Sequence, residues 1–317
     1  MQNNAVIDSP RKYRTRYLAD NEKFLGWVFL LPAVLYIIVL VGVPFALAIA
    51  FSLADVTVGD TTLNFVGLRN FATILGTPEF WQSLRDTFGF AITAQIITII
   101  LANILAVLLS TDFRGKWIAL VLIMLPWSTP IALGAVGWLW LLDSKFSPID
   151  WVLRYFALLG NEGALLGVSK NLYYLGKAQL AQASIIMVYV WRMLPLSAVI
   201  LLAGLTSIPQ DLLDQAEVDG STFLRTLFQI KLPLILPIMV IAILFSFIYT
   251  VGDMAIVFIL TRGGPVYYTH VLPTWAYIKG IEGGALAEGA AIALFIFPVL
   301  LAAAIIMLRY SRRTEVL

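Results

Sequence analysis

The sequence predicts an all-α protein that crosses a membrane six times. Hydrophobic residues make up 60% of its 317 residues and charged residues only 13%, about half the charged share of a soluble domain. Five stretches contain no Asp, Glu, Lys or Arg, and a sixth contains only Arg192. Each can cross about 30 Å of hydrocarbon as a helix. The six predicted spans are 24–54, 87–111, 117–142, 178–204, 232–252 and 289–308.

The first span follows a polar tail, residues 1–23. It is longer than the apolar core of a cleaved signal peptide, so we predict that it is retained. Basic residues are more frequent in the segments on the same side as this tail, which predicts by the positive-inside rule that this side is cytoplasmic. The expected organisation is a cytoplasmic tail (1–23), a transmembrane domain (24–310) and a second cytoplasmic tail (311–317).

Two short helices are predicted in the outer segments. Thr77-Pro78 and Ser147-Pro148 each join a capping residue to a proline that suits the first helical position. Apolar residues follow at helical spacing, namely Phe80, Trp81 and Leu84 in the first case and Ile149, Val152, Phe156 and Leu159 in the second. We interpret these helices as packing and interfacial elements rather than substrate contacts.

The segment between the fourth and fifth spans predicts a helix–turn–helix. Pro209 fits a helix start, and Gly220 fits its end because glycine adopts the left-handed conformation at little cost. Ser221 is the expected cap of a second helix, which Pro233 would end. Acids occupy the first helix at Asp211, Asp214, Glu217 and Asp219, and an apolar stripe follows in the second at Phe223, Leu227 and Ile230. A structured cytoplasmic loop of this kind indicates a docking element.

The motifs that would indicate catalysis are missing. Gly115-Lys116 and Gly176-Lys177 lack the rest of a Walker loop, so ATP binding by that route is not expected. There is no cysteine, and His270 is the single histidine, so no zinc site of the usual type is expected. No nucleophile elbow is present. We therefore predict no enzyme activity and no cofactor in this chain, and a solvated His270 in an outer loop.

Two charged residues inside spans predict a polar site. Arg192 lies about 18 Å into its span by helical rise, and Asp253 lies in the next one. A charge near the bilayer midplane costs at least about 2.5–3.5 kcal/mol, so such residues usually face a bundle interior or a wet cavity. Two interpretations stay open: the residues bind a substrate, or they form an ion pair that joins two helices.

The helix–turn–helix resembles the EAA loop of binding-protein-dependent ABC importers. The family pattern E-A-A-x-x-D-G-A, followed after eight residues by I-x-L-P, is matched by Asp214-Gln215-Ala216, Asp219-Gly220-Ser221 and Ile230–Pro233. Asp214, Gln215 and Ser221 depart from that pattern. Further motifs are similar to the permease subunits of maltose and glycerol-3-phosphate importers. They are Val66–Phe71, Leu125-Pro126-Trp127, Trp191–Pro195, Thr261–Pro265, Thr269, Leu272-Pro273 and Ala276-Tyr277.

This resemblance implies a type I ABC importer permease fold in the inner membrane of a prokaryote. It implies that residues 207–233 form a coupling loop, with Asp214, Ala216, Asp219, Gly220 and Ser221 against a cytoplasmic ATPase. The implied partners are a second homologous permease subunit, two subunits that bind ATP and magnesium, an extracytoplasmic solute-binding protein and membrane lipid, but no nucleic acid.

The resemblance also carries the family's sugar-contacting positions onto seven residues: Tyr189, Arg192, Met193, Leu196, Ser246, Tyr249 and Asp253. Those on each span share one helix face, and aromatic rings with a few polar groups suit a polyhydroxyl ligand. A carbohydrate or polyol is therefore expected; a neutral sugar, a phosphorylated polyol and a sulfonated sugar stay open. The alternatives are an ion-coupled secondary transporter that uses Asp253, and an assembly protein without a substrate.

Overall fold

The structure, a computed structural model, describes residues 22–314. Of the predicted cytoplasmic tails, residues 1–21 and 315–317 lie outside the described residues, and residues 311–314 form the end of a helix. The chain divides into two compact units between Ala50 and Phe51. The described part of the first unit is one apolar helix, made of α1 (Glu22–Ile37), a π-helical turn (Ile38–Gly42) and the start of α2 (Val43–Ser52).

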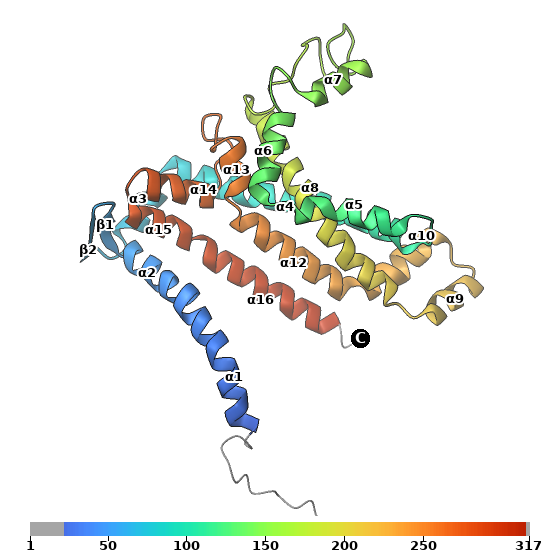
Figure 1. The fold of residues 1–317 in the computed structure, drawn as a ribbon, viewed down its shortest axis with the longest axis horizontal. Helices are drawn as coiled ribbons and strands as arrows, with labels where there is room; N and C mark the ends of the chain where they lie inside the picture. The colour runs from blue at the N-terminus through green and yellow to red at the C-terminus, as the bar shows by residue number, and fades with distance from the viewer. Residues whose placement is uncertain (1–21, 315–317) are drawn as a thin grey trace, which may run out of the picture. The chain divides into compact units, whose positions relative to one another are not determined.

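The second unit begins with a β-hairpin and continues with helices (Figure 1). The antiparallel strands are β1 (Ala54–Thr57) and β2 (Asp60–Phe65). The longer helices are α4 (Pro78–Ser110), α5 (Lys116–Ser128), α6 (Ile131–Leu141), α8 (Ala178–Thr206), α12 (Leu236–Gly252) and α16 (Ile296–Thr314). The shorter ones are α3 (Arg69–Leu75), α7 (Pro148–Tyr155), α9 (Gln210–Val218), α10 (Phe223–Thr226), α11 (Leu232–Leu234), α13 (Ala255–Leu260), α14 (Leu272–Tyr277) and α15 (Leu286–Leu294), with π-helical turns at Leu227–Lys231 and Ile278–Glu282.

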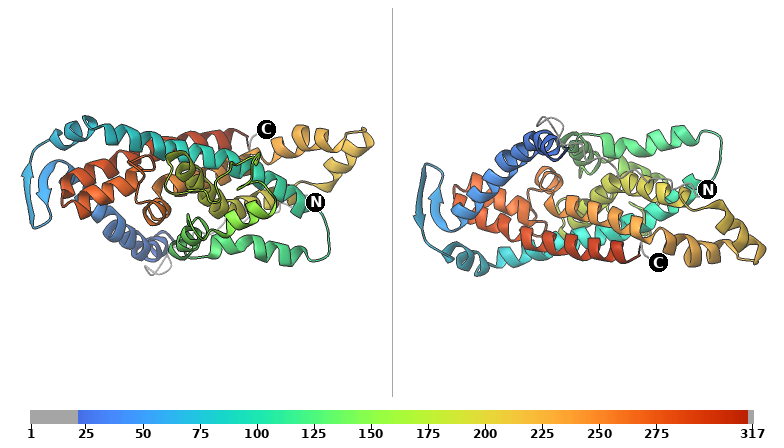
Figure 2. Two further views of the ribbon diagram at one scale, coloured as in Figure 1. Left: turned by 90° about the horizontal axis from the view of Figure 1, so that it is seen from above. Right: turned by 90° about the horizontal axis from the view of Figure 1, so that it is seen from below.

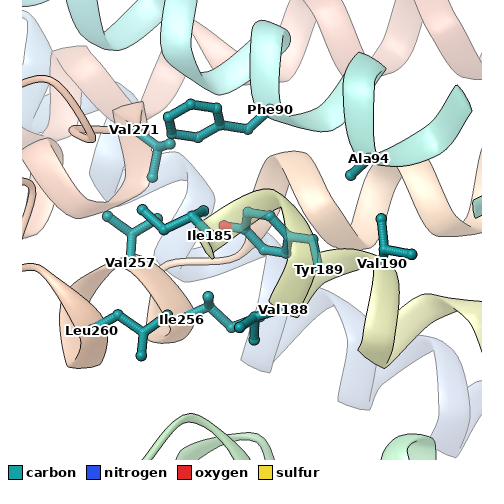
Figure 3. Close-up of a cluster of buried hydrophobic side chains, with 10 residues drawn as sticks. All are labelled: Phe90, Ala94, Ile185, Val188, Tyr189, Val190, Ile256, Val257, Leu260 and Val271. Atoms are coloured by element: carbon teal, nitrogen blue, oxygen red, sulfur yellow. The ribbon is translucent and has the colours of Figure 1, made fainter. Parts of the chain in front are cut away.

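Four helices, α4, α8, α12 and α16, pack together as the centre of this unit (Figures 1 and 2). α9 and α10 lie at one end of the bundle, whereas the hairpin, α3 and α15 lie at the other. A cluster of buried side chains from α4, α8 and α13 fills part of the interior, with Tyr189 among Ile185, Val257 and their neighbours (Figure 3). Apolar burial of this kind fixes α8, which carries four of the seven predicted substrate residues.

The described helices include four single candidate spans and two bent pairs. The single helices are Phe24–Ser52, Pro78–Ser110, Ala178–Thr206 and Leu286–Tyr310, and the pairs are Lys116–Ser128 with Ile131–Leu141 and Phe223–Leu234 with Leu236–Gly252. Six spans result if each bent pair counts as one. A separate outer helix was predicted at residues 78–84. That prediction is wrong, because this segment forms the first turns of α4.

The predicted span 117–142 is broken by a bend of 95° between α5 and α6. Thr129 is extended and Pro130 precedes the first residue of α6. Proline has no N–H to donate and disfavours a helical conformation in the residue before it, which accounts for the interruption. α6 therefore leaves the line of α5 (Figure 1), and this bend positions the cavity described below.

The hairpin was not predicted from the sequence. Asn70 stabilises its first strand, because the side-chain amide donates to the carbonyls of Ser52 (2.9 Å) and Ala54 (2.8 Å). The buried Asn70 thus satisfies two backbone acceptors where α2 passes into β1. Asn70, a member of the Val66–Phe71 motif, therefore stabilises the start of the hairpin.

The predicted start of α7 is confirmed, since the Ser147 hydroxyl accepts from the Asp150 N–H at 3.2 Å. The helix ends at Tyr155, earlier than the predicted stripe, and Ala157 has a positive φ of 55°. His270, expected to be solvated, is instead buried with 4% exposure. Gly263 makes this possible, because a Cβ there would lie 2.3 Å from the imidazole ring.

Candidate functional site

A cavity of about 250 Å³ lies beside α8, where α12 ends and α6 begins. Its lining residues are Ile131, Tyr189, Arg192, Met193, Tyr249, Gly252, Asp253 and Ile256. Five of the seven predicted substrate residues are therefore brought together. Leu196 and Ser246 do not line the cavity; each lies about one helical turn from a residue that does, Arg192 or Tyr249.

Arg192 is held by the residues that precede the α5–α6 bend. Its guanidinium Nη1 donates to the carbonyl oxygen of Thr129 at 3.2 Å, and the group lies 5.6 Å from the centre of the Trp127 ring. Within residues 22–314, no ion pair joins Arg192 to Asp253. The ion pair that the sequence left open is therefore not formed, and both charged groups border the same cavity.

Asp253 follows the last residue of α12 and caps the next helix. Its Oδ2 accepts from the Ile256 N–H at 3.0 Å, near the start of α13. The Tyr189 hydroxyl is buried and lies close enough to this carboxylate to interact with it. A phenol and a carboxylate side by side can donate to and accept from the hydroxyl groups of a ligand.

Aromatic rings pack against Tyr249, which lines the cavity from α12. The Tyr249 ring lies 4.6 Å from that of Phe245 and 5.8 Å from that of Trp127. Trp127, Thr129 and Ile131 were not predicted as site residues. The Leu125-Pro126-Trp127 motif was the available signal, but a motif does not indicate which distant residue its members contact.

The helix–turn–helix, which we call the elbow (residues 209–234), forms at the end of the bundle marked by α9 and α10 (Figure 1). Gly220 has a φ of +73°, as predicted for a left-handed helix end. The Ser221 N–H donates to the Ala216 carbonyl (2.9 Å) and the Gly220 N–H to the Glu217 carbonyl (3.0 Å). These are the two bonds of a Schellman motif, so the turn satisfies its own backbone.

Two details of the elbow differ from the prediction. Thr222 rather than Ser221 caps the second helix, because the Thr222 hydroxyl accepts from the Arg225 N–H. Pro233 does not end that helix; it continues to Leu234, and the chain then bends by 69° into α12. A π-helical turn, Leu227–Lys231, directly precedes the last residues of this helix, Leu232–Leu234.

The predicted coupling residues have different surroundings. Ala216 is buried, and Ser221 is partly buried. Asp214, Asp219 and Gly220 are exposed, and neither acid forms an ion pair within the described chain. The exposed face of the elbow therefore carries free negative charge.

Comparison with known families identifies the chain. Residues 99–315, which include α8, the elbow and α12–α16, match the family described as "Binding-protein-dependent transport system inner membrane component". This chain is a member of that family. The resemblance predicted from the EAA-like loop is confirmed, and the family description agrees with a multi-pass inner membrane protein that has several candidate spans.

Relatives of this inner membrane component cover nearly its whole length. The trehalose/maltose transport system permease protein MalF of Thermococcus litoralis is 28% identical over 98% of this chain and 99% of its own. The sn-glycerol-3-phosphate transport system permease protein UgpA of Pectobacterium atrosepticum is 26% identical over 92% and 95%. Both are named as permease proteins of transport systems.

A solved structure shares the fold. A chain of a bacterial ABC transporter involved in the import of the acidic polysaccharide alginate superimposes with a TM-score of 0.76 at 18% identity, covering 92% of this chain and 96% of that chain. At this identity the match concerns the fold alone. It confirms that this inner membrane component has the type I importer permease fold.

Proposed function

We propose that this chain forms part of the path by which an ABC importer carries a carbohydrate or related polyol across the inner membrane. The observation that carries the proposal is the cavity of about 250 Å³ beside α8, which we call the Arg192 cavity. It gathers Arg192, Asp253 and two tyrosines inside a helical bundle. Isolated charges are costly in a membrane, and residues that keep them usually serve a substrate or ion path.

The chemistry of the cavity suits a polyhydroxyl solute. Arg192 supplies several donors, Asp253 supplies acceptors, and the buried Tyr189 hydroxyl can donate or accept. The exposed ring of Tyr249 supplies an apolar face for the C–H side of a sugar ring. Relatives named for trehalose, maltose and glycerol 3-phosphate support this class of solute.

The elbow supports the energy-coupling part of the proposal. Its free acids and exposed apolar side chains, including Leu212, Phe223 and Phe228, are suited to a cleft that carries arginines and an apolar floor. We infer that Asp214, Ala216, Asp219, Gly220 and Ser221 transmit closure of two partner ATPase subunits, which would bind the ATP and magnesium. The elbow and both termini would then be cytoplasmic.

Reconstitution tests this function. The chain, a second permease subunit, two ATPase subunits and the solute-binding protein are placed in proteoliposomes, and uptake of labelled maltose and glycerol 3-phosphate is measured with and without ATP. We expect uptake of one of them to require ATP and the binding protein. Replacing Arg192 with Met should remove that uptake while assembly of the complex is retained.

Two outcomes would overturn the proposal. Uptake that needs no nucleotide and stops with an uncoupler would assign the chain to ion-coupled transport, with Asp253 as the proton or sodium site. Normal ATP-driven uptake after Arg192 and Asp253 are both made apolar would leave the cavity without a role in transport.

A further inference from the structure

An apolar groove lies between α4 and the second helix of the elbow and was not predicted from the sequence. Its volume is about 570 Å³, within the range of about 300–1,000 Å³ that is typical of sites for organic ligands. The lining residues are Ile100, Asn103, Ile104, Val107 and Leu108 from α4, and Phe223, Leu227, Phe228 and Leu232 from the elbow. None of them lines the Arg192 cavity. We call this hollow the elbow groove.

The walls of the elbow groove favour an apolar occupant. Among the described residues that line it, Asn103 alone is polar, and its Nδ2 is used within α4, where it donates to the Ile99 carbonyl at 2.8 Å. Ile104 is 52% exposed, Leu108 59% and Phe228 63%. Removing apolar surface of this kind from water is favourable, so a hydrocarbon chain would be stabilised here.

The groove lies where the membrane-spanning part of α4 ends. Residues 100–108 belong to the last turns of α4, which ends at Ser110. The second helix of the elbow meets α12 at a bend of 69°, so it does not continue the line of that span. Exposed apolar side chains on such a helix are typical of the boundary between hydrocarbon and headgroups. Trp117, 70% exposed near the start of α5, supports this level, because tryptophan is enriched at that boundary.

Basic residues flank the elbow groove on both walls. On the elbow, Arg225 lies within the stretch that lines the groove, and Lys231 directly precedes Leu232, the last lining residue. On the other wall, Arg114 follows the end of α4. Within residues 22–314, none of these three basic side chains forms an ion pair. Their positive charge is therefore available to a ligand.

Acidic residues near the groove do not cancel this charge. Asp112, in the turn after α4, already forms an ion pair with Lys116 at 3.5 Å. The four acids of the elbow belong to residues 209–220, none of which lines the groove. The elbow groove thus combines an apolar channel with positive charge at the headgroup level. A phospholipid has the complementary chemistry, because it joins apolar acyl chains to a negatively charged phosphate.

We propose that the elbow groove binds an anionic phospholipid of the membrane, with an acyl chain along α4 and the headgroup at Arg114, Arg225 and Lys231. Guanidinium groups pair with phosphate through two parallel hydrogen bonds, and basic residues near a membrane surface attract anionic lipids. The site does not depend on which solute is carried. Phe223 and Phe228 line the groove and are still 63% exposed, so the lipid lies beside the surface proposed for the ATPase.

Local quenching tests the site in the complete importer complex. The chain has no cysteine, so Thr111→Cys, just after α4, gives it a single position for a fluorescent label. The complex is placed in nanodiscs with equal amounts of phosphatidylglycerol and phosphatidylcholine, one of which carries brominated acyl chains. We expect brominated phosphatidylglycerol to quench the label about fivefold more strongly than brominated phosphatidylcholine, the ratio given by about one favourable charge contact.

Two pairs of variants test the charge and the apolar channel separately. Arg114→Gln combined with Arg225→Gln should make the two lipids quench equally, whereas Arg309→Gln, an exposed basic residue near the end of α16, should keep the preference. Ile104→Trp fills the groove and should reduce quenching by both lipids about threefold. Ile96→Trp is its matched control, because Ile96 is 54% exposed on α4 but does not line the groove.

Three results would overturn the lipid site. Equal quenching by the two lipids in the unsubstituted groove would show that it does not select negative charge. Quenching by neither lipid would show that protein, such as a helix of the second permease subunit, covers the groove. An equal loss of preference in Arg309→Gln would assign the effect to the charge of the whole surface. Because the measurement uses neither solute nor nucleotide, each of these results leaves the proposed transport function standing.

Discussion

The Arg192 cavity and the elbow both present charged groups, but they are built in opposite ways. The cavity joins residues from three distant segments, near 131, 189–193 and 249–256. The elbow is contiguous, and its turn is closed by hydrogen bonds between residues 216 and 221. The charged groups of the cavity are partly buried, whereas the acids of the elbow are exposed.

This difference sets the size of the effects that substitutions should have. Electrostatic interactions are stronger where water is excluded, and a buried group that loses its partner keeps its desolvation cost. Exposed charges contribute about 0–1 kcal/mol to stability. The elbow acids should therefore matter for a partner's docking rather than for the fold of this chain.

The largest effect is expected at Asp253. Asp253→Ala removes the cap of α13, which is worth about 1 kcal/mol, and also the acceptors that border the cavity. We expect ATP-driven uptake by the reconstituted complex to be lost and thermal stability to fall. Asp253→Asn keeps a capping oxygen and removes the charge, so stability should be nearly retained while uptake is lost. Wild-type uptake in Asp253→Ala would contradict the role of the cavity.

A smaller effect is expected at Gly220, where the strain is local. Its surroundings leave room for a side chain, since a Cβ would meet nothing within 4 Å. The left-handed conformation is the constraint, and it costs most residues roughly 1–2 kcal/mol. Gly220→Val should therefore insert normally but reduce ATP-driven uptake by about tenfold, whereas Gly220→Asn should be milder because Asn tolerates this conformation.

If Gly220→Val and Gly220→Asn lose uptake equally, the size of the side chain at a docking surface is the cause, and backbone strain is not. Normal coupled uptake in Gly220→Val would remove the elbow from the mechanism. The measurement is the ratio of solute uptake to ATP hydrolysis in the same vesicles.

His270, in the loop between α13 and α14, tests how burial affects the stability of a loop. Burial lowers the pKa of His270, and its Nδ1 has no hydrogen-bond partner among the described residues. The open loop therefore binds a proton more readily than the packed loop, and acid should favour opening below about pH 6.5. Hydrogen exchange of residues 261–271, corrected for intrinsic rates, should become faster as the pH falls, and His270→Phe should remove that dependence.

The smallest effect on the chain itself is expected at the elbow acids. Asp214→Asn and Asp219→Asn should change its stability by less than about 0.5 kcal/mol, but weaken ATPase docking and lower uptake several-fold. Asp211→Asn, an exposed acid outside the motif, is the control and should leave uptake unchanged. A large loss of stability in Asp219→Asn would break the distinction between the two regions.

Local features of the fold could be predicted because their causes are local. Runs without charge marked the spans, Gly220 marked a left-handed turn, and Ser147 marked the start of α7. The shared face of Tyr189, Arg192 and Met193 follows from helical periodicity alone. Where two neighbouring residues could each cap a helix, as with Ser221 and Thr222, the sequence did not distinguish them.

By itself, then, the sequence determined the membrane-spanning class, the elbow and the residues that α8 and α12 present together. Only the tertiary structure decided that the third predicted span bends by 95°, that Arg192 contacts Thr129 instead of Asp253, and that His270 is buried against Gly263. The physical reason is distance along the chain. Hydrophobic periodicity and capping act over a few neighbouring residues, whereas these contacts join segments whose approach depends on how all the helices pack.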